Sequence, residues 1–179
     1  MKKLSEILNI DVEAKVKEFK KGDILQRAGD SNSSTFYVSK GLLRSYIIDS
    51  KGKEHIFMFA PENWIIADVE ALEFNEPVQL FIDCLEDAEV ISFNKDSLFK
   101  ADLPKEKMVE NAQLLYRRMG KLQRRVLLLM GSPAIERYNY FLDTYPELPN
   151  RIPQRMIASY LGITPQALST MRGEMARKK

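Results

Sequence analysis

The fold is decided by residues 19–59, which read FKKGDILQRAGDSNSSTFYVSKGLLRSYIIDSKGKEHIFMF. Four glycines, Gly22, Gly29, Gly41 and Gly52, interrupt this stretch at intervals of about ten residues. Glycine suits tight turns because it adopts positive φ angles without a clash from a β-carbon. The stretch therefore predicts short strands that are joined by four turns.

The segments between these turns have the composition of strands. Residues 35–38, 42–48 and 55–59 are rich in aromatic and β-branched side chains, which favour a pleated, half-buried surface. Further along, 79–85 and 88–93 flank a Glu-Asp pair in a pattern that predicts a hairpin. Many short strands at this spacing predict a jelly roll or a small antiparallel barrel.

From Pro104 onwards a helical pattern replaces the strand pattern. Apolar side chains recur in alternating steps of four and three residues, at Met108, Ala112, Leu115, Met119, Leu122, Val126 and Leu129. This pattern predicts one helix about 38 Å long with an apolar seam. The seam would lie either on the rest of the same chain or against a second copy. We favour the second copy, because a barrel and a small helical domain leave much of so long a seam uncovered.

Three residues predict where this helix ends and the next begins. Gly131 supplies the stop, Ser132 is the expected N-cap, and Pro133 is the expected first helical residue. The apolar face predicted for the second helix consists of Ile135, Tyr138, Phe141 and Leu142. Residues 147–151 then form a short loop with room for a turn or a strand.

The last motif lies in residues 152–175, which read IPQRMIASYLGITPQALSTMRGEM. Counted from Gln154, Ala158 and Gly162 occupy positions five and nine, where a helix-turn-helix needs a small residue and a turn glycine. Thr164 and Pro165 predict the N-cap and the first residue of the second helix. The apolar residues expected to pack the two helices together are Ile157, Leu161, Ile163, Leu168 and Met171.

Two ordinary packed helices with a glycine turn give a similar pattern, but the match at seven constrained positions favours DNA binding. The N-terminal side of a second helix of this kind enters the major groove. The residues expected to face bases are Pro165, Gln166, Ser169 and Thr170, with Arg172 beside them. The residues expected to contact phosphates are Arg151, Arg155, Thr164, Arg177 and Lys178.

The charge distribution agrees with a polyanionic partner for the C-terminal part only. The chain has 179 residues and a formal net charge of +2. Residues 1–103 carry 13 cationic and 19 acidic side chains, a net charge of −6, whereas residues 104–179 carry 14 and 6, a net charge of +8. A basic half attached to an acidic half indicates that the C-terminal half meets DNA.

Composition also excludes several classes of protein. No run approaches the ~18 consecutive apolar residues of a membrane span, so we expect no membrane partner and a cytoplasmic protein. One cysteine and one histidine rule out a cysteine-rich or multi-histidine metal site. A cupin-type enzyme shares this barrel but needs about three metal-binding histidines, so we predict that the chain is not an enzyme.

The order of barrel, heptad helix and helix-turn-helix resembles the Crp/Fnr family of bacterial transcription regulators. The resemblance covers nearly the whole chain and rests on residues 19–30, 36–44 and 49–54, which look like the strands of a cyclic-nucleotide-binding barrel. Residues 149–165 are similar to the variant common in Bacteroidetes. The resemblance implies an α+β fold with a jelly-roll sensor barrel, a homodimer formed through the long helix, a winged-helix-like DNA-binding domain and a two-fold symmetric DNA site.

The expected ligand pocket departs from the family pattern. Relatives that bind cyclic nucleotides carry Gly-Glu-Leu and then an Arg-Ser or Arg-Thr pair that holds the phosphate. Here Asp68 is the candidate to stand in for the ribose-binding Glu, whereas Val78 and Gln79 replace the phosphate-binding pair. Residues 54–94 contain ten carboxylates and no Lys or Arg, and a buried phosphate without a cationic partner is costly to desolvate. We therefore predict that the chain has no cofactor, and that neither cyclic AMP nor cyclic GMP binds to it in the way usual for the family.

The remaining single residues have structural interpretations. We expect His55 to be packed or at the surface and Cys84 to be a small core residue. The aromatic residues expected to fill the core, rather than to line a pocket, are Phe59, Trp64, Phe74 and Phe81.

The sequence thus predicts a sensor barrel over 1–103 with a short helix at 2–9, a dimerisation helix over 104–130, and a DNA-binding domain over 131–179. The leading hypothesis is a homodimeric transcription regulator with a degenerate sensor barrel. The alternative is a protein-interaction or ligand-binding barrel that does not bind DNA. RNA polymerase and an unknown small-molecule effector stay open as further partners.

Overall fold

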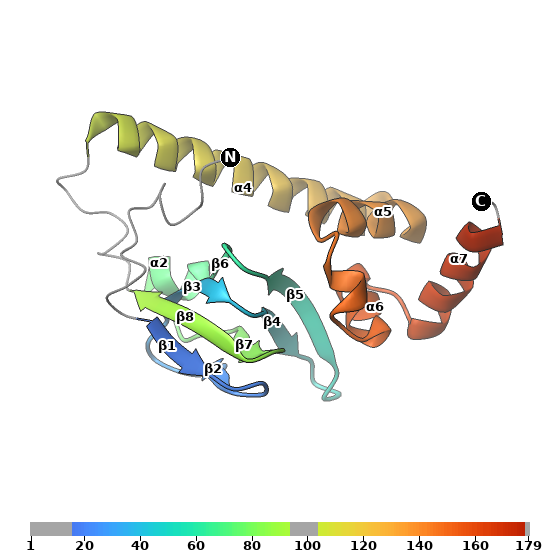
Figure 1. Cartoon of the computed structure of the whole chain (residues 1–179), viewed down its shortest axis with the longest axis horizontal. Coiled ribbons are helices and arrows are strands. Elements are labelled where there is room, and N and C mark those ends of the chain that lie inside the picture. Colours follow the sequence, from blue (N-terminus) through green and yellow to red (C-terminus); the bar gives the residue numbers. More distant parts are fainter. Residues whose placement is uncertain (1–15, 94–103, 178–179) are drawn as a thin grey trace. The chain divides into compact units, whose positions relative to one another are not determined.

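The computed structural model describes residues 16–93 and 104–177, so the helix expected at 2–9 lies outside the described residues. The chain divides into two compact units, Met1–Gln113 and Leu114–Lys179. The first unit holds the described strands and the start of the long helix at 105–131, and the second unit holds the rest of that helix and the helices that follow it (Figure 1).

Eight strands and one short helix make up the described part of the barrel unit before its last helix begins. The strands are β1 Val16–Phe19, β2 Ile24–Gln26, β3 Thr35–Lys40, β4 Leu43–Ile48, β5 Glu54–Ala60, β6 Ile65–Ile66, β7 Phe81–Cys84 and β8 Ala88–Phe93. The short helix is α2, Val69–Phe74. The three segments with strand composition thus form β3, β4 and β5, as predicted.

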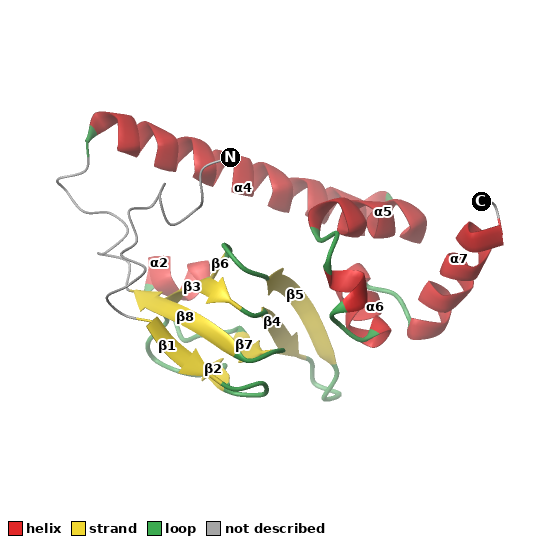
Figure 2. Ribbon diagram, viewed as in Figure 1, coloured by secondary structure: helices red, strands yellow, loops and turns green. Residues whose placement is uncertain are grey.

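The strands form two four-stranded antiparallel sheets with the orders β1-β8-β3-β6 and β2-β7-β4-β5 (Figure 2). One buried cluster takes side chains from both sheets, among them Val38 and Val90 from the first and Leu43 and Ile82 from the second. A core shared by two sheets is the arrangement of a jelly roll or barrel, and it confirms the predicted α+β class.

The predicted hairpin of β7 and β8 is wrong. β7 pairs with β2 and β4, whereas β8 pairs with β1 and β3, so the chain crosses from one sheet to the other between the two strands. Cys84 and Ala88 are both buried in the shared core. Because β7 and β8 belong to different sheets, the crossing brings their side chains to the shared core from two sheets.

All four predicted glycine turns are present, with φ angles of 92°, 92°, 90° and 77° at Gly22, Gly29, Gly41 and Gly52. Gly41 is the most constrained of them. A β-carbon there would overlap the carbonyl oxygen of Asp87, because the turn after β3 packs against the crossing between β7 and β8. Glycine is therefore required at this position for close approach as well as for its φ angle.

Helices make up all the regular structure after residue 104. They are α4 Lys105–Gly131, α5 Ala134–Thr144, the 3-10 helix η1 Leu148–Asn150, α6 Gln154–Leu161 and α7 Pro165–Arg177. Residues 104–177 contain no strand, so this part of the chain holds no β wing. None of the described helices is long and apolar enough to cross a membrane.

The junction of α4 and α5 differs from the prediction by one residue. The N–H of Ser132 still donates to the carbonyl of Leu128, at 3.1 Å, so Ser132 completes the hydrogen bonding of α4. The N-cap of α5 is therefore Pro133, with φ −58° and ψ 153°, and not Ser132. Gly131 is the last residue of α4 and does not have a positive φ angle.

An aromatic cluster holds α5 and α6 together. The ring centroid of Phe141 lies 5.6 Å from that of Tyr145 and 5.5 Å from that of Tyr160, and the rings of Tyr145 and Tyr160 meet edge to face at 5.8 Å. All three side chains are buried. The predicted apolar face of α5 thus packs as expected, with Tyr138 also buried.

Candidate nucleic-acid interface and ligand region

The turn between α6 and α7 is built around Gly162. This glycine has a φ angle of 66°, its N–H donates to the carbonyl of Ser159 at 3.1 Å, and the N–H of Ile163 donates to that of Ala158 at 3.0 Å. This pair of hydrogen bonds is a Schellman motif, which ends a helix with a left-handed residue. A residue with a β-carbon would be strained at this point, so the sequence stops α6 here.

The two helices joined by this turn share a small core. The structure buries Ile157, Ala158, Leu161 and Leu168, and leaves Ile163 and Met171 half-buried. Ala158 is fully covered, which a larger side chain at the crossing would prevent. The predicted packing residues therefore lie on the inner sides of α6 and α7.

The outer face of α7 is polar and exposed. Pro165, Gln166, Ser169 and Thr170 are all exposed, whereas Arg172 is half-buried. The predicted N-cap is present, since the Thr164 hydroxyl oxygen accepts from the N–H of Ala167 at 3.2 Å. The four residues expected to read bases thus share a free surface at the start of α7.

The residues expected to contact phosphates are placed less uniformly. Arg155, Thr164 and Arg177 are exposed, and Arg151 is half-buried just before α6. Lys178 lies outside the described residues. The exposed cations therefore lie at the start of α6 and at the end of α7.

The predicted seam of α4 is open to solvent in the single chain. The exposed fractions of Leu115, Met119, Leu122 and Val126 lie between 45% and 58%, Ala112 is exposed, and no residue of α4 is buried. Beside the seam, Tyr116 and Met130 are 72% and 79% exposed. The helix thus presents a long unburied apolar surface, which is unusual for a protein that stays monomeric.

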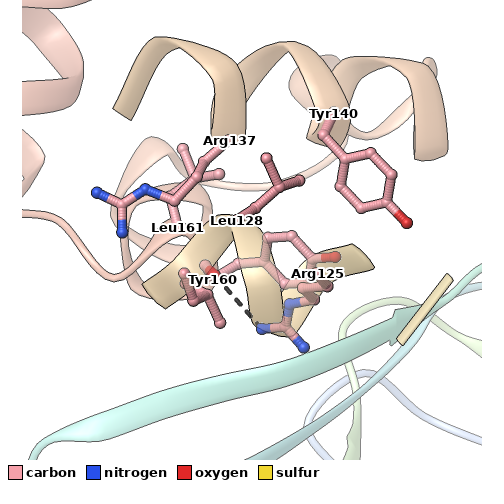
Figure 3. A pocket seen from close by; sticks show the side chains of 7 residues that line it. Arg125, Leu128, Arg137, Tyr140, Tyr160 and Leu161 are labelled. Carbon is pink, nitrogen blue, oxygen red and sulfur yellow. Dashed lines mark hydrogen bonds between the residues drawn. The ribbon is translucent and has the colours of Figure 1, made fainter. Parts of the chain in front are cut away.

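A small cavity lies where α4, α5 and α6 meet (Figure 3). Its volume is about 10 Å³, which is room for one water molecule and too little for an organic effector. The residues that line it are Arg125, Leu128, Leu129, Arg137, Tyr140, Tyr160 and Leu161. Sequence reasoning did not single out Arg125 or Tyr160, although the cavity shows that they belong to one cluster.

In the barrel unit, Asp68 is engaged by the chain itself. Its carboxylate accepts hydrogen bonds from the backbone N–H groups of Ala71, Gln79 and Leu80, at 3.2, 2.8 and 2.9 Å, and only 3% of the residue is exposed. Asp68 is the N-cap of α2 and ties that helix to the segment before β7. This carboxylate therefore binds backbone N–H groups of the chain itself.

The other two residues of the expected pocket offer no cation either. Val78 is buried, and its N–H and carbonyl are bonded to Asp30 and Gly29. Gln79 is exposed, and its side-chain amide donates to Glu70 at 3.2 Å. The segment that replaces the family's phosphate-binding pair thus presents an apolar side chain and an amide that faces a carboxylate.

Sequence reasoning missed a buried charge cluster around Arg44. Its Nε and Nη2 donate to the two carboxylate oxygens of Asp83 at 2.8 and 2.9 Å, and its Nη1 donates to Glu54. The guanidinium carbon lies 4.1 Å from the ring centroid of Tyr46, whose ring stacks on Phe81. The available signal was one arginine and one aspartate in otherwise apolar strands, at 42–48 and 79–85.

Electrostatics keep the guanidinium of Arg44 protonated. Burial by itself lowers the pKa of Arg44, but the hydrogen bonds that it donates to Asp83 and Glu54 outweigh burial and raise the pKa overall. Desolvation, followed by the charge of Asp83, raises the pKa of Tyr46, which stays a neutral phenol. Arg44 therefore remains a cation, and two carboxylates of the chain already neutralise it.

The described residues offer no obvious set of metal ligands. Across 16–93 and 104–177, no group of three or more histidine, cysteine, aspartate or glutamate side chains is arranged to hold a metal ion. Cys84 is buried, and desolvation raises the pKa of its thiol to about 12, so the thiolate is scarce at neutral pH. His55 is partly exposed and lies 2.8 Å from a carboxylate oxygen of Asp49.

Comparison with known proteins agrees with this geometry. Residues 16–101 match the sequence model of the cyclic nucleotide-binding domain family. The structure is similar to that of FixK2 from Bradyrhizobium japonicum, with a TM-score of 0.74, 20% sequence identity, and coverage of 91% of this chain and 84% of that chain. A search of curated protein sequences gives no match.

Two further solved structures share the fold. A CooA variant from Carboxydothermus hydrogenoformans aligns with a TM-score of 0.75 and 18% identity, over 99% of this chain and 85% of that chain. TTHA1359 from Thermus thermophilus, a transcriptional regulator of the CRP/FNR family, aligns with a TM-score of 0.70 and 19% identity, over 92% and 87%. Residues 16–101 thus match a cyclic nucleotide-binding domain, and the chain shares the fold of these solved structures, one of which is a regulator of the CRP/FNR family.

Proposed function

We propose that this chain is a sequence-specific DNA-binding transcription regulator of the CRP/FNR type that acts as a homodimer. The observation that carries the proposal is the exposed polar face of α7, and the left-handed Gly162 and the buried Ala158 between α6 and α7 support a helix-turn-helix. The likeness to CRP/FNR structures over nearly the whole chain supports the same function.

In this proposal α7 is the recognition helix and enters the major groove. Gln166 pairs with an adenine through N6 and N7, while Ser169 and Thr170 accept several bases. Arg172 lies beside them and Pro165 fixes the start of the helix. The residues that bind phosphates are Arg151, Arg155, Thr164, Arg177 and Lys178, which position α7 without reading sequence.

Dimerisation is proposed to bury the seam of α4. Leu115, Met119, Leu122 and Val126 of one copy would pack against the same residues of a second copy, which removes their exposed apolar surface from water. A two-fold dimer places two recognition helices on half-sites one helical turn apart, about 34–36 Å, so the DNA site is palindromic.

The barrel is proposed not to hold cyclic AMP or cyclic GMP in the usual way, although residues 16–101 match the cyclic nucleotide-binding domain. Between Glu54 and Phe93 the chain has no Lys or Arg, and the buried cation Arg44 donates to two carboxylates. A ligand phosphate would have to displace one of them. Isothermal titration showing micromolar binding of cyclic AMP would contradict this part of the proposal.

Selection of bound duplexes from a random library tests DNA binding directly. We expect one palindromic sequence and a steep loss of affinity with salt, about one log unit per phosphate contact for each tenfold rise in salt. Gln166→Ala combined with Thr170→Ala should lower the affinity for the selected duplex by about 10- to 100-fold and leave the affinity for non-specific DNA unchanged. Gln113→Ala, which removes an exposed glutamine of α4, is the matched control and should bind as the wild type does.

The alternative function predicts a different result. A barrel that serves only protein interaction would select no sequence, and the double variant would then behave like the control.

The proposed regulator works in the cytoplasm, with DNA and a second copy as partners and RNA polymerase as the machinery it acts on. A small-molecule effector would have to use a site other than the cavity of about 10 Å³.

A further inference from the structure

Arg125 joins α4 to the last turn of α6. Its guanidinium carbon lies 4.0 Å from the ring centroid of Tyr160, and its Nη2 lies 3.4 Å from the carbonyl oxygen of the same residue (Figure 3). The guanidinium of Arg125 therefore contacts both the side chain and the backbone of Tyr160. Both residues belong to the helical unit Leu114–Lys179.

The position of Tyr160 makes this contact favourable. Tyr160 is the last residue but one of α6, where carbonyl groups lack partners within the helix and the helix dipole is negative. A cation is stabilised at such an end, and an aromatic face adds a cation–π interaction. Because Tyr160 is only 5% exposed and its ring packs on Phe141 and Tyr145, Arg125 is held against a rigid surface.

Two neighbouring contacts restrain the same junction. The Tyr140 hydroxyl of α5 donates to the carbonyl of Lys121 in α4 at 3.1 Å. The side chain of Leu129 lies next to Gly162, since a β-carbon on that glycine would be 3.6 Å from Leu129 Cδ2. The end of α4 thus supports α5, the end of α6 and the turn that leads into α7.

We propose that Arg125 is a positioning residue that sets the angle between α4 and the α6–α7 pair, and thereby the spacing of the two DNA half-sites. This inference rests on the proposed function. In a dimer joined through α4, the separation of the two α7 helices depends on the angle at which each α6–α7 pair leaves its α4. Arg125 fixes that angle from the α4 side and reads no base itself.

The geometry is sensitive enough for a single contact to matter. The 13 residues of α7 span about 20 Å at ~1.5 Å per residue. A rotation of about 10° over that length moves the far end by roughly 3.5 Å, close to the ~3.4 Å rise of one base pair. Loosening the contact between Arg125 and Tyr160 would therefore let the dimer accept half-sites that are one base pair closer or further apart, in addition to the wild-type spacing.

The test compares three single variants of the full chain. Arg125→Gln removes the cation and the stacking, and Arg125→Lys keeps the charge without the planar guanidinium. Arg117→Gln removes one charge from an exposed position of the same helix and is the matched control. The first measurement is duplex selection from a library in which the spacer between two fixed half-sites varies in length.

We expect the wild type and Arg117→Gln to select one spacer length and Arg125→Gln to accept about three, with the same half-site bases. Arg125→Lys should fall between them. A purely structural role would lower affinity at every spacer equally. If Arg125→Gln selects the single wild-type spacer, the inference is wrong.

The second measurement needs no DNA, so it separates this inference from the proposed function. Hydrogen exchange at the amides of Gly162 and Ile163 reports how firmly the turn is held. We expect exchange about 5- to 10-fold faster in Arg125→Gln than in the wild type, and unchanged exchange in Arg117→Gln. Unchanged exchange in Arg125→Gln would overturn the inference, whereas a wild type that selects no duplex would overturn the proposed function instead.

Discussion

Removing one partner of the buried ion pair between Arg44 and Asp83 should destabilise the barrel much more than removing both partners. Their side chains are 8% and 12% exposed, and Asp83 accepts two hydrogen bonds from the guanidinium. Asp83→Asn therefore leaves a buried cation that only Glu54 neutralises, and Glu54 is 46% exposed.

The magnitude follows from these contacts. Removing one partner of a buried ion pair costs about 3–5 kcal/mol. Glu54 keeps one of its contacts with Arg44, so we expect Asp83→Asn to lower the free energy of unfolding by about 3 kcal/mol. For a domain of about 100 residues this lowers Tm by about 15 °C. Arg44→Met combined with Asp83→Leu removes both charges and should lie within about 1 kcal/mol of the wild type.

Urea denaturation followed by tryptophan fluorescence measures this effect, because Trp64 is the only tryptophan and packs against the barrel core. Glu89→Gln is the matched control, since Glu89 pairs with Lys40 at the surface, with side chains 40% and 72% exposed. It should change stability by about 0.5 kcal/mol or less. The reasoning is refuted if Asp83→Asn is as mild as the control, or if the double variant is less stable than Asp83→Asn.

Three further results are expected in the barrel unit. Gly52→Ala should cost about 1–2 kcal/mol for its positive φ angle, and Gly41→Ala about 2 kcal/mol more because its β-carbon also overlaps backbone, as thermal unfolding of the two variants would show. Cys84, the only cysteine, should resist iodoacetamide at pH 8 until the chain is denatured, because burial raises the pKa of its thiol to about 12; rapid alkylation of the native protein would contradict this. The hydrogen bond with His55, together with two backbone N–H groups, lowers the pKa of Asp49 from 3.8 to about 2, so this stabilisation is complete above pH 4 and is lost as the pH falls toward 2. His55→Gln should bring the pKa of Asp49 back toward 3.8 in an NMR titration, and an unchanged pKa would show that the pair is not formed.

The features that could be predicted from the sequence are those with local causes. A glycine between two segments of strand composition predicts a turn at its own position, and all four turns predicted in this way in the barrel are present. A sustained alternation of apolar residues in steps of four and three likewise predicts a helix, which the structure confirms as α4. Gly162 and Thr164 set the end of α6 and the start of α7 through backbone groups within a few residues.

The pairing of strands has no such local cause. The Glu-Asp pair between β7 and β8 has the composition of a hairpin turn, and the same residues serve a crossing between sheets equally well. Which strand β7 joins depends on β2 and β4, which lie about 60 and 40 residues away in the sequence. The local sequence pattern around β7 therefore does not determine which strands β7 pairs with.

Burial of single side chains was predictable only in part. The core interpretation was right for Phe59, which is fully buried, and wrong for Phe74, which is 68% exposed at the end of α2. The six-residue α2 turns Ala71 inward and leaves its last residue outside. Arg44 was missed for the opposite reason, since a charged residue is expected at the surface unless its partner on another strand is known.

The strand order has a consequence for how the chain is made. β1 and β2, at the start of the barrel, pair with β8 and β7, at its end, so neither sheet is complete until residues 81–93 have left the ribosome. Until then β3 lacks its neighbour β8, and β4 lacks its neighbour β7. At about 5–20 residues per second, several seconds separate the synthesis of β1 from that of β8. The newly made barrel should therefore depend on chaperones during this interval, and a chain truncated before β8 should aggregate rather than fold.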